Sequence, residues 1–416
     1  MSPRVKKGVV LTLKIAVLVG LLEYARRQSQ FGDEIAMPEA GAAFHDEFVG
    51  PGVRLKVVDV RKSVDGTPLA YAVRTPSGSV SEIPASDVEG SSAPAAAGHA
   101  RFSLLPGLAT LFHGLDWRYL GLGFAAFGPP IFLMAVRWRI LLRASGVEVP
   151  FWVLVRLHYM AFFFNTFMPG GAGGDIIKAV YVTQHSEQKA EAATMVLIDR
   201  VVGLAGLLAM AGTVVLVDYG ELHGIAAQVG TISLALMVGF VLYFSEAFRK
   251  LIRYDAILER LPRSEVLKKV DAALFALRSK KRDLTMAFAL TVGFQLVEVV
   301  GVWFAGRALG LYKASFVHYV AFVPIGYLFN ALPISFGGIG LMEGAYLKLF
   351  RDAGVATATQ GFMLGVLARI IVVGWSMLGV FSALFPPKRA EALAEATEDA
   401  TEGGPQAAPS NTPRSM

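Results

Sequence analysis

The sequence predicts an all-α polytopic membrane protein with a small β-rich insert after the first helix. The chain has 416 residues, of which 54% are hydrophobic, and its mean hydropathy is +0.52. Several nearly uncharged runs reach about 18 residues, the length at which a helix crosses the hydrocarbon core. We expect about six full spans and two re-entrant broken-helix hairpins, so seven or eight hydrophobic segments.

The N-terminal part predicts two different structures. Basic residues precede an apolar run, Gly8–Leu22, without a clear cleavage site, so 1–25 is interpreted as an uncleaved first transmembrane helix rather than a signal peptide. Residues 26–105 instead alternate polar and apolar side chains between turn signals, which is typical of strands. We expect an extracytoplasmic β-rich module ending in a linker. It is either a spacer or a place where an envelope protein binds.

The remaining chain divides at residue 388. Residues 106–388 hold most of the apolar runs and form the predicted membrane core. Residues 389–416 are rich in Ala and Glu, then in Pro and Ser, and predict a disordered cytoplasmic tail.

Composition excludes several classes of site. The chain has no cysteine, which excludes disulfides, thiolate zinc sites and cysteine nucleophiles. Its seven histidines are scattered, so we expect neither a metal nor another cofactor. The net charge of +6 needs no nucleic-acid partner, because cytoplasmic loops of membrane proteins usually carry surplus Lys and Arg.

Charge also predicts the topology. Segment 249–282 holds eleven Lys or Arg against four acids, which places it in the cytoplasm. Counting spans from there puts both termini in the cytoplasm of a bacterial-type inner membrane. It also makes 151–177 begin and end inside. Its 27 residues are too few for two full spans of about 20 residues each, so a re-entrant hairpin is the simplest solution.

Both predicted hairpins contain helix-breaking residues. The first break runs from Asn165 to Asp175 and the second from Asn330 to Glu343. Broken backbone at membrane depth is tolerated where it is buried in protein or lines a water-filled cavity, so the breaks indicate a functional site. The two segments overlay without a gap at an offset of 165. This predicts an inverted repeat, as in many transporters, with chance similarity of Gly-rich segments as the alternative.

Charged residues follow both breaks. Asp175 and Lys178 share a helix face, and together with the Gly amides they suit a lipid phosphate. The alternative is an internal ion pair. Asp199-Arg200 begins a helix, where an acid is also favoured by the dipole.

The second half carries its own intramembrane charges. Glu343 and Glu298 are carboxylates within apolar segments, and Arg369 needs one of them as a partner. Asn165 and Asn330 either cap the broken helices or bind substrate. Arg137, by contrast, is interpreted mainly as an anchor at the inner membrane face.

The residues that we expect to bind substrate lie in the two breaks and on the helices after them. They are Asn165, Pro169, Gly170, Gly171, Gly173, Gly174, Asp175, Lys178, Asp199, Arg200, Asn330, Pro333, Gly337, Gly338, Glu343 and Arg369.

Four motifs in order carry a family resemblance: Arg137-Trp138-Arg139, the segment Asn165–Asp175, Asp199-Arg200 and the segment Pro333–Glu343. Over residues 106–386 the chain resembles the lysylphosphatidylglycerol synthase transmembrane-region family, also described as flippase-like. Lys178 stands where that family usually has an arginine. Nothing after residue 388 could form the soluble aminoacyl-transferase domain of bifunctional members, so the resemblance implies lipid handling without lysyl transfer.

The leading hypothesis is therefore a lipid translocase for a membrane phospholipid or a polyprenyl-phosphate-linked lipid. A membrane-embedded transferase is the second hypothesis, although the sequence lacks a metal cluster and a nucleophile–base pair. An envelope scaffold is the third, but a scaffold has no need of buried charges at broken helices. The oligomeric state stays open.

Overall fold

The computed structural model describes the β-rich insert and most of the predicted membrane core. The described residues are 32–37, 42–44, 47–49, 53–65, 67–89, 102–144, 146–167, 173–184, 189–217, 225–243, 245–252, 254, 268, 271, 280–331 and 338–384. The predicted first helix (1–25), most of the linker and the predicted tail lie outside them.

The insert folds as the predicted small sheet. Its strands are β1 (Glu34–Ala36), β2 (Ala42–Phe44), β3 (Glu47–Val49), β4 (Arg54–Lys62), β5 (Pro68–Arg74), β6 (Val80–Pro84), β7 (Val88–Glu89) and β8 (Phe102–Leu105). Six of them form one sheet in the order β6-β5-β4-β1-β8-β7, and β2 pairs with β3. Gly78 in the predicted β5–β6 turn has φ +93°, which glycine adopts without steric cost. The alternating apolar side chains bury a small core around Ile35, Val73 and Ile83.

The rest of the described chain is helical. The helices are α2 (Leu108–His113), α3 (Trp117–Ala126), α4 (Pro129–Ala144), α5 (Phe151–Phe167), α6 (Gly173–Gln184), α7 (Lys189–Val217), α8 (Ile225–Tyr243), α9 (Glu246–Leu251), α12 (Lys281–Ala308), α13 (Phe316–Ala331), α14 (Leu341–Asp352) and α15 (Ala358–Leu384). Gly128 and Pro129 separate α3 from α4, as expected where proline begins a helix.

Four stretches in the described residues are long and apolar enough to cross a membrane. They are Trp117–Ala144, Thr194–Gly212, Lys281–Ala308 and Ala358–Leu384, and two shorter apolar helices lie at Gly230–Gly239 and Phe316–Asn330. The helical membrane fold is therefore confirmed, while the number of full spans stays a prediction.

Two successive runs of helices have similar lengths. In the first run, 117–144 has 28 residues, α5 has 17, α6 has 12 and α7 has 29. In the second run, α12 has 28 residues, α13 has 16, α14 has 12 and α15 has 27. The hairpin of each run contacts the long helix of the other, since α5 packs on α15 and α13 packs on α7.

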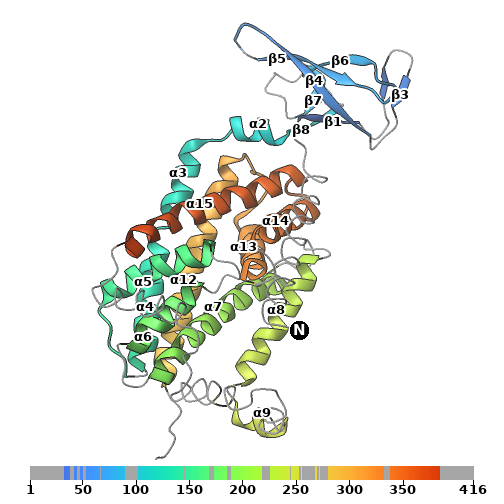
Figure 1. Ribbon diagram of the computed structural model, residues 1–416. Coiled ribbons are helices and arrows are strands. Elements are labelled where there is room, and N and C mark those ends of the chain that lie inside the picture. The colour runs from blue at the N-terminus through green and yellow to red at the C-terminus, as the bar shows by residue number, and fades with distance from the viewer. Residues whose placement is uncertain are drawn as a thin grey trace, which may run out of the picture.

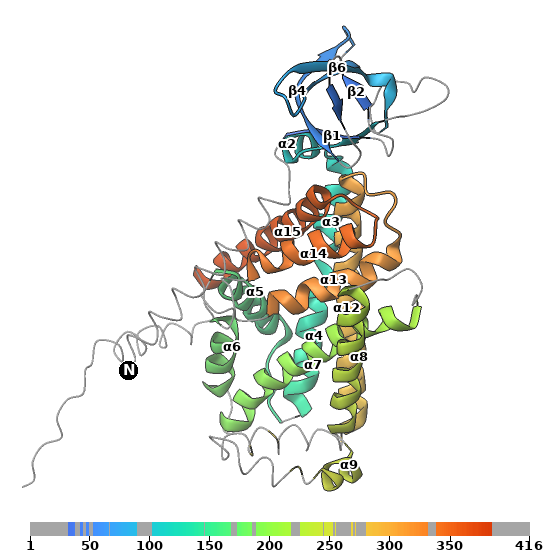
Figure 2. The same cartoon turned by 90° about the vertical axis from the view of Figure 1, so that its right-hand side faces the viewer.

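Each run has its own apolar core. One cluster joins side chains of α4 to α7, with Trp138, Leu141 and Leu154 among its most buried members. The other joins α12 to α15, with Tyr319, Phe322 and Phe350 at its centre. The β-module lies at one end of the helical body and α9 at the opposite end (Figures 1 and 2).

Candidate functional site

The first break is closed by Asn165 near the end of α5. The Asn165 side-chain oxygen accepts a hydrogen bond of 2.8 Å from the backbone N–H of Gly174, in the first turn of α6. A Cβ on Gly174 would collide with the backbone of Ala161 on α5. Gly174 thus permits the close approach of α5 and α6, and Asn165 takes the place of a helix cap from across the break.

The second break is held by Arg369 on α15. Its guanidinium donates to the Asn330 side-chain oxygen at 3.2 Å, to the Gly338 carbonyl at 2.9 Å and to the Glu343 carboxylate at 2.7 Å. Glu343 also accepts from the Gly340 N–H at 2.8 Å. Gly338 has φ +69°, so it supplies the left-handed backbone that this arrangement requires. Of the two predicted partners for Arg369, the structure shows Glu343.

The two hairpins place their charges alike. Asp175 is the third residue of α6 and Glu343 the third residue of α14. Asp175 bonds to Arg200 on α7 at 2.5 Å, as Glu343 bonds to Arg369 on α15. Five predicted site residues in the breaks lie outside the described residues: Pro169, Gly170, Gly171, Pro333 and Gly337. Gly173 begins α6 and is buried.

A second charged cluster lies deeper, between α4, α6 and α7. Asp199 accepts from the Arg137 guanidinium at 2.7 Å and from the Lys178 ammonium at 3.4 Å, and all three side chains are at least 92% buried. Arg137 also donates to the Thr291 hydroxyl at 3.1 Å. Lys178 lies over the Trp138 ring, 4.9 Å from its centre.

This cluster corrects the interpretation of Arg137. The sequence favoured an anchor at the inner membrane face, because three arginines near the end of one predicted span are typical of such anchors. Arg137 is only 5% exposed, since α4 continues to Ala144 and carries it into the interior. A carboxylate on a distant helix, Asp199, supplies its partner, and the local sequence contains no signal of that pairing.

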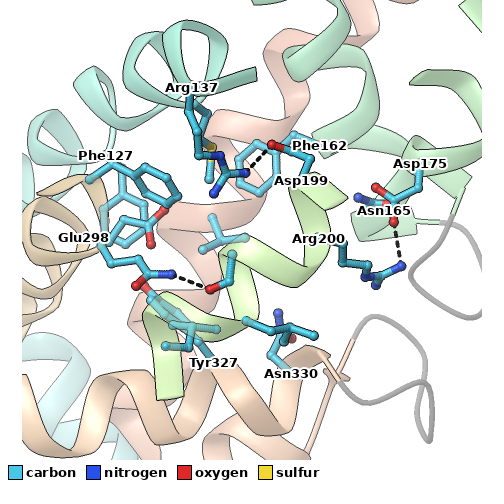
Figure 3. Close-up of a pocket in the computed structure, with 17 residues that line it drawn as sticks. Phe127, Arg137, Phe162, Asn165, Asp175, Asp199, Arg200, Glu298, Tyr327 and Asn330 are labelled. Atoms are coloured by element: carbon cyan, nitrogen blue, oxygen red, sulfur yellow. Dashed lines mark hydrogen bonds and ion pairs between the residues drawn. The ribbon is translucent and has the colours of Figure 1, made fainter. Parts of the chain in front are cut away.

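The charged clusters border a cavity of about 300 Å³ between the two runs of helices. Figure 3 shows Arg137, Asp199, Arg200 and Glu298 around it. Asn165 and Asn330, one from each hairpin, also line it. Of the other predicted site residues, Asp175 lines this cavity, whereas Glu343 and Arg369 are not among its lining residues. A smaller adjoining cavity of about 140 Å³ is lined by Lys178, His158 and again Glu298.

Several lining residues were missed or left outside the predicted set. Glu298 was noted from sequence as an intramembrane carboxylate, and the structure places it on the wall of both cavities. Gln295 donates to the Gly203 carbonyl at 3.0 Å, and Tyr327 also lines the larger cavity. His158 donates from Nδ1 to the Leu154 carbonyl at 2.9 Å. Polarity within an apolar helix was the available signal for all three.

The deeper charged cluster is unbalanced when it is counted by itself. Two buried cations, Arg137 and Lys178, share the single carboxylate of Asp199, so these three side chains together carry one excess positive charge. Aromatic side chains such as Phe127 and Phe162 supply apolar wall beside it. Among the described residues, no group of three His, Asp or Glu is placed to hold a metal ion.

Comparison with known proteins agrees with this setting. The model of the family described as "Lysylphosphatidylglycerol synthase TM region" matches residues 102–379. No curated protein and no solved structure showed significant similarity to the chain. The match begins at β8 and covers the helices that build the site. The chain therefore belongs to the lysylphosphatidylglycerol synthase transmembrane-region family, and it is a multi-pass membrane protein of that family.

Proposed function

We propose that the protein is a lipid translocase that passes an anionic headgroup through the cavity between its two hairpins. The headgroup belongs to a phospholipid or to a polyprenyl-phosphate-linked lipid, and the apolar chains stay in the bilayer. The protein performs no covalent chemistry in this proposal. The observation that carries it is the pairing of two buried cations with one carboxylate beside a polar cavity in a membrane-spanning core.

The surplus charge supports an anionic substrate. A buried unpaired charge is costly in a membrane interior, so it is retained where a function needs it. Lys178 is held over Trp138 and bonded to Asp199 at 3.4 Å, a longer contact than the 2.7 Å that Arg137 makes. Lys178 is thus the cation that a headgroup phosphate could most readily draw away from Asp199.

The paired hairpins support movement through the membrane. Helices α5 and α13 begin at residues 151 and 316, an offset of 165, whereas α6 and α14 begin at 173 and 341, an offset of 168. If the halves are repeats, the second break is three residues longer. Asp175 then corresponds to Glu343, whereas the constant offset of 165 in the gapless overlay aligns Lys178 with Glu343. Reciprocal packing of each hairpin on the other half is what an inverted repeat would produce.

The ends of the helical body support the predicted orientation. The β-module adjoins the α12–α13 and α14–α15 connections, because Leu104, Tyr312 and Thr357 line one pocket. The Lys280 side chain reaches the Ala144 carbonyl near the other end. In this proposal the module faces outward from a bacterial-type inner membrane, while the basic segment and both termini face the cytoplasm.

A reconstitution assay tests the proposed function. The full chain is placed in vesicles that contain fluorescent phosphatidylglycerol or a fluorescent polyprenyl phosphate, and reduction of the probe from outside reports its transfer between leaflets. We expect transfer of at least one of these lipids by the wild type, a clear loss in Lys178→Met, and no change in Asp283→Asn on the cytoplasmic end of α12. Transfer of each lipid at equal rates by wild type and Lys178→Met would refute the proposal.

Labelling of single cysteines tests the orientation. The chain has no cysteine of its own, so Lys313→Cys and Lys250→Cys each introduce one exposed thiol. We expect an impermeant maleimide to label Lys313→Cys from outside intact cells and Lys250→Cys only after the cells are opened. Labelling of both from the same side would contradict the proposed topology.

A further inference from the structure

Glu298 is the carboxylate that the described contacts of the site leave unused. It lies roughly 25 Å along α12 from Lys281 and roughly 15 Å from Ala308, at about 1.5 Å per residue. It is therefore well inside a 28-residue candidate span. Its side chain makes no hydrogen bond or ion pair with any other residue that the structure describes.

The charged groups around Glu298 affect whether its carboxyl group is protonated. Helix α12 packs against α3, α4, α7, α13 and α15. From these helices and from α5 and α6, the titratable and charged groups that line the two cavities with Glu298 are Arg137, His158, Asp175, Lys178, Asp199, Arg200 and Tyr327. Arg137 and Lys178 are both bonded to Asp199, and Asp175 is bonded to Arg200.

The balance of charge depends on Glu298 alone. The two cavities are lined by three cations (Arg137, Lys178 and Arg200) and by three carboxylates (Asp175, Asp199 and Glu298). With Glu298 ionised, these six charges cancel, and the cavity offers an anion no net attraction. With Glu298 neutral, one positive charge remains. The excess positive charge of the Arg137–Lys178–Asp199 cluster is therefore balanced by Glu298 when this carboxylate is ionised, and it is left unbalanced when Glu298 carries a proton.

Glu298 also lies beside a cavity that has room for water. The smaller cavity of about 140 Å³ adjoins Glu298 and His158, and it is large enough for a few water molecules at about 30 Å³ each. His158 uses Nδ1 for the Leu154 carbonyl, which leaves Nε2 buried without a hydrogen-bond partner among the described residues. Glu298 and His158 thus line one small cavity in which water can reach the carboxylate.

We infer that Glu298 binds a proton together with the anionic headgroup, so that translocation is coupled to a proton gradient. This inference rests on the proposed function for its transport step, but the coupled binding stands on the geometry of the cavity. A headgroup phosphate beside Arg137 and Lys178 repels the Glu298 carboxylate and favours its neutral form. By linkage, protonation of Glu298 tightens headgroup binding by the same factor.

Infrared spectroscopy of the full-length protein in detergent tests the binding step. We expect a carbonyl stretch of a protonated carboxyl that titrates with pH, that is absent in Glu298→Gln and that is kept in Asp283→Asn, the matched control on the same helix. Dihexanoyl-phosphatidylglycerol should raise the midpoint of this titration by about one pH unit, a tenfold effect. The zwitterionic dihexanoyl-phosphatidylcholine should leave the midpoint unchanged.

Vesicles with an imposed proton gradient test the transport step. We expect wild type and Glu298→Asp to move phosphatidylglycerol faster in the direction of proton flow, and Glu298→Gln to ignore the gradient. The inference is overturned if the Glu298 band is missing at every pH, if phosphatidylglycerol does not shift it, or if Glu298→Gln follows the gradient like wild type. A shifted band without lipid transfer by the wild type would instead refute the proposed function and retain the coupled binding.

Discussion

Replacing Asp199 by asparagine should destabilise the protein far more than replacing Lys178 by methionine. Asp199 is the shared acceptor of Arg137 at 2.7 Å and of Lys178 at 3.4 Å. Its loss leaves two buried cations without a counter-charge. Removing one partner from a buried ion pair costs about 3–5 kcal/mol. We expect Asp199→Asn to lower the free energy of unfolding by that amount.

Lys178→Met, unlike Asp199→Asn, should change the free energy of unfolding only slightly. It removes the surplus cation, and methionine fills most of the same volume with apolar atoms beside Trp138. Removal of one partner is costly when it leaves a buried charge uncompensated; here Asp199 keeps Arg137 at 2.7 Å, so we expect a change within about 1 kcal/mol. The Arg137–Asp199 pair remains intact in this variant.

Thermal unfolding in one detergent, followed by the loss of helical circular dichroism, measures the difference. Asp199→Asn should lower Tm by several degrees, and Lys178→Met should stay near wild type. Equal losses in the two variants would refute the assignment of Asp199 as the shared counter-charge. A stable Lys178→Met protein also makes the transport assay interpretable, since lost transfer would then reflect lost charge.

Three further predictions concern the two breaks and the basic segment 249–282. Gly174→Ala should cost about 1–3 kcal/mol of stability, because its Cβ collides with the α5 backbone. Gly293→Ala, where a Cβ meets open space, should not destabilise, and equal Tm losses would contradict this packing. Arg369→Lys should lower Tm, because an ammonium cannot reproduce the fork to Glu343, Gly338 and Asn330. The control is Arg61→Lys, which is exposed and should leave Tm unchanged. An unchanged Tm in Arg369→Lys would show that these hydrogen bonds of Arg369 do not stabilise the second break. In the basic segment 249–282, burial raises the pKa of Asp271, but its bonds to Arg249 and Tyr243 outweigh that effect and hold the pKa below the ordinary value. Because the folded pKa is the lower one, the pair contributes its full stability above the unfolded value of about 3.9 and loses it as pH falls through the folded pKa. The Tm difference between wild type and Asp271→Asn should therefore be present at neutral pH and vanish in acid. A difference that is independent of pH would show that the pair does not titrate in this way.

The sequence alone determined the class of the protein and the approximate position of the two helix breaks. Apolar run length predicts membrane helices because the bilayer fixes how many residues must be apolar. Alternation of polar and apolar side chains predicted the β-module, because successive side chains of a strand point to opposite faces. Glycine, proline and asparagine indicated the breaks at 165–175 and 330–343, since these residues act on the backbone next to them.

Only the tertiary structure decided which charges meet. Asp175 and Lys178 share a helix face, yet each bonds to α7, to Arg200 and Asp199 respectively. Arg137 looked like an interfacial anchor until Asp199, 62 positions further along the chain, proved to be its partner. Glu298 became the candidate proton-binding residue because it lines both cavities and makes no hydrogen bond or ion pair with another described residue. The pairing of buried charges depends on how helices that are far apart in the sequence pack together. Local sequence patterns carry no information about this packing.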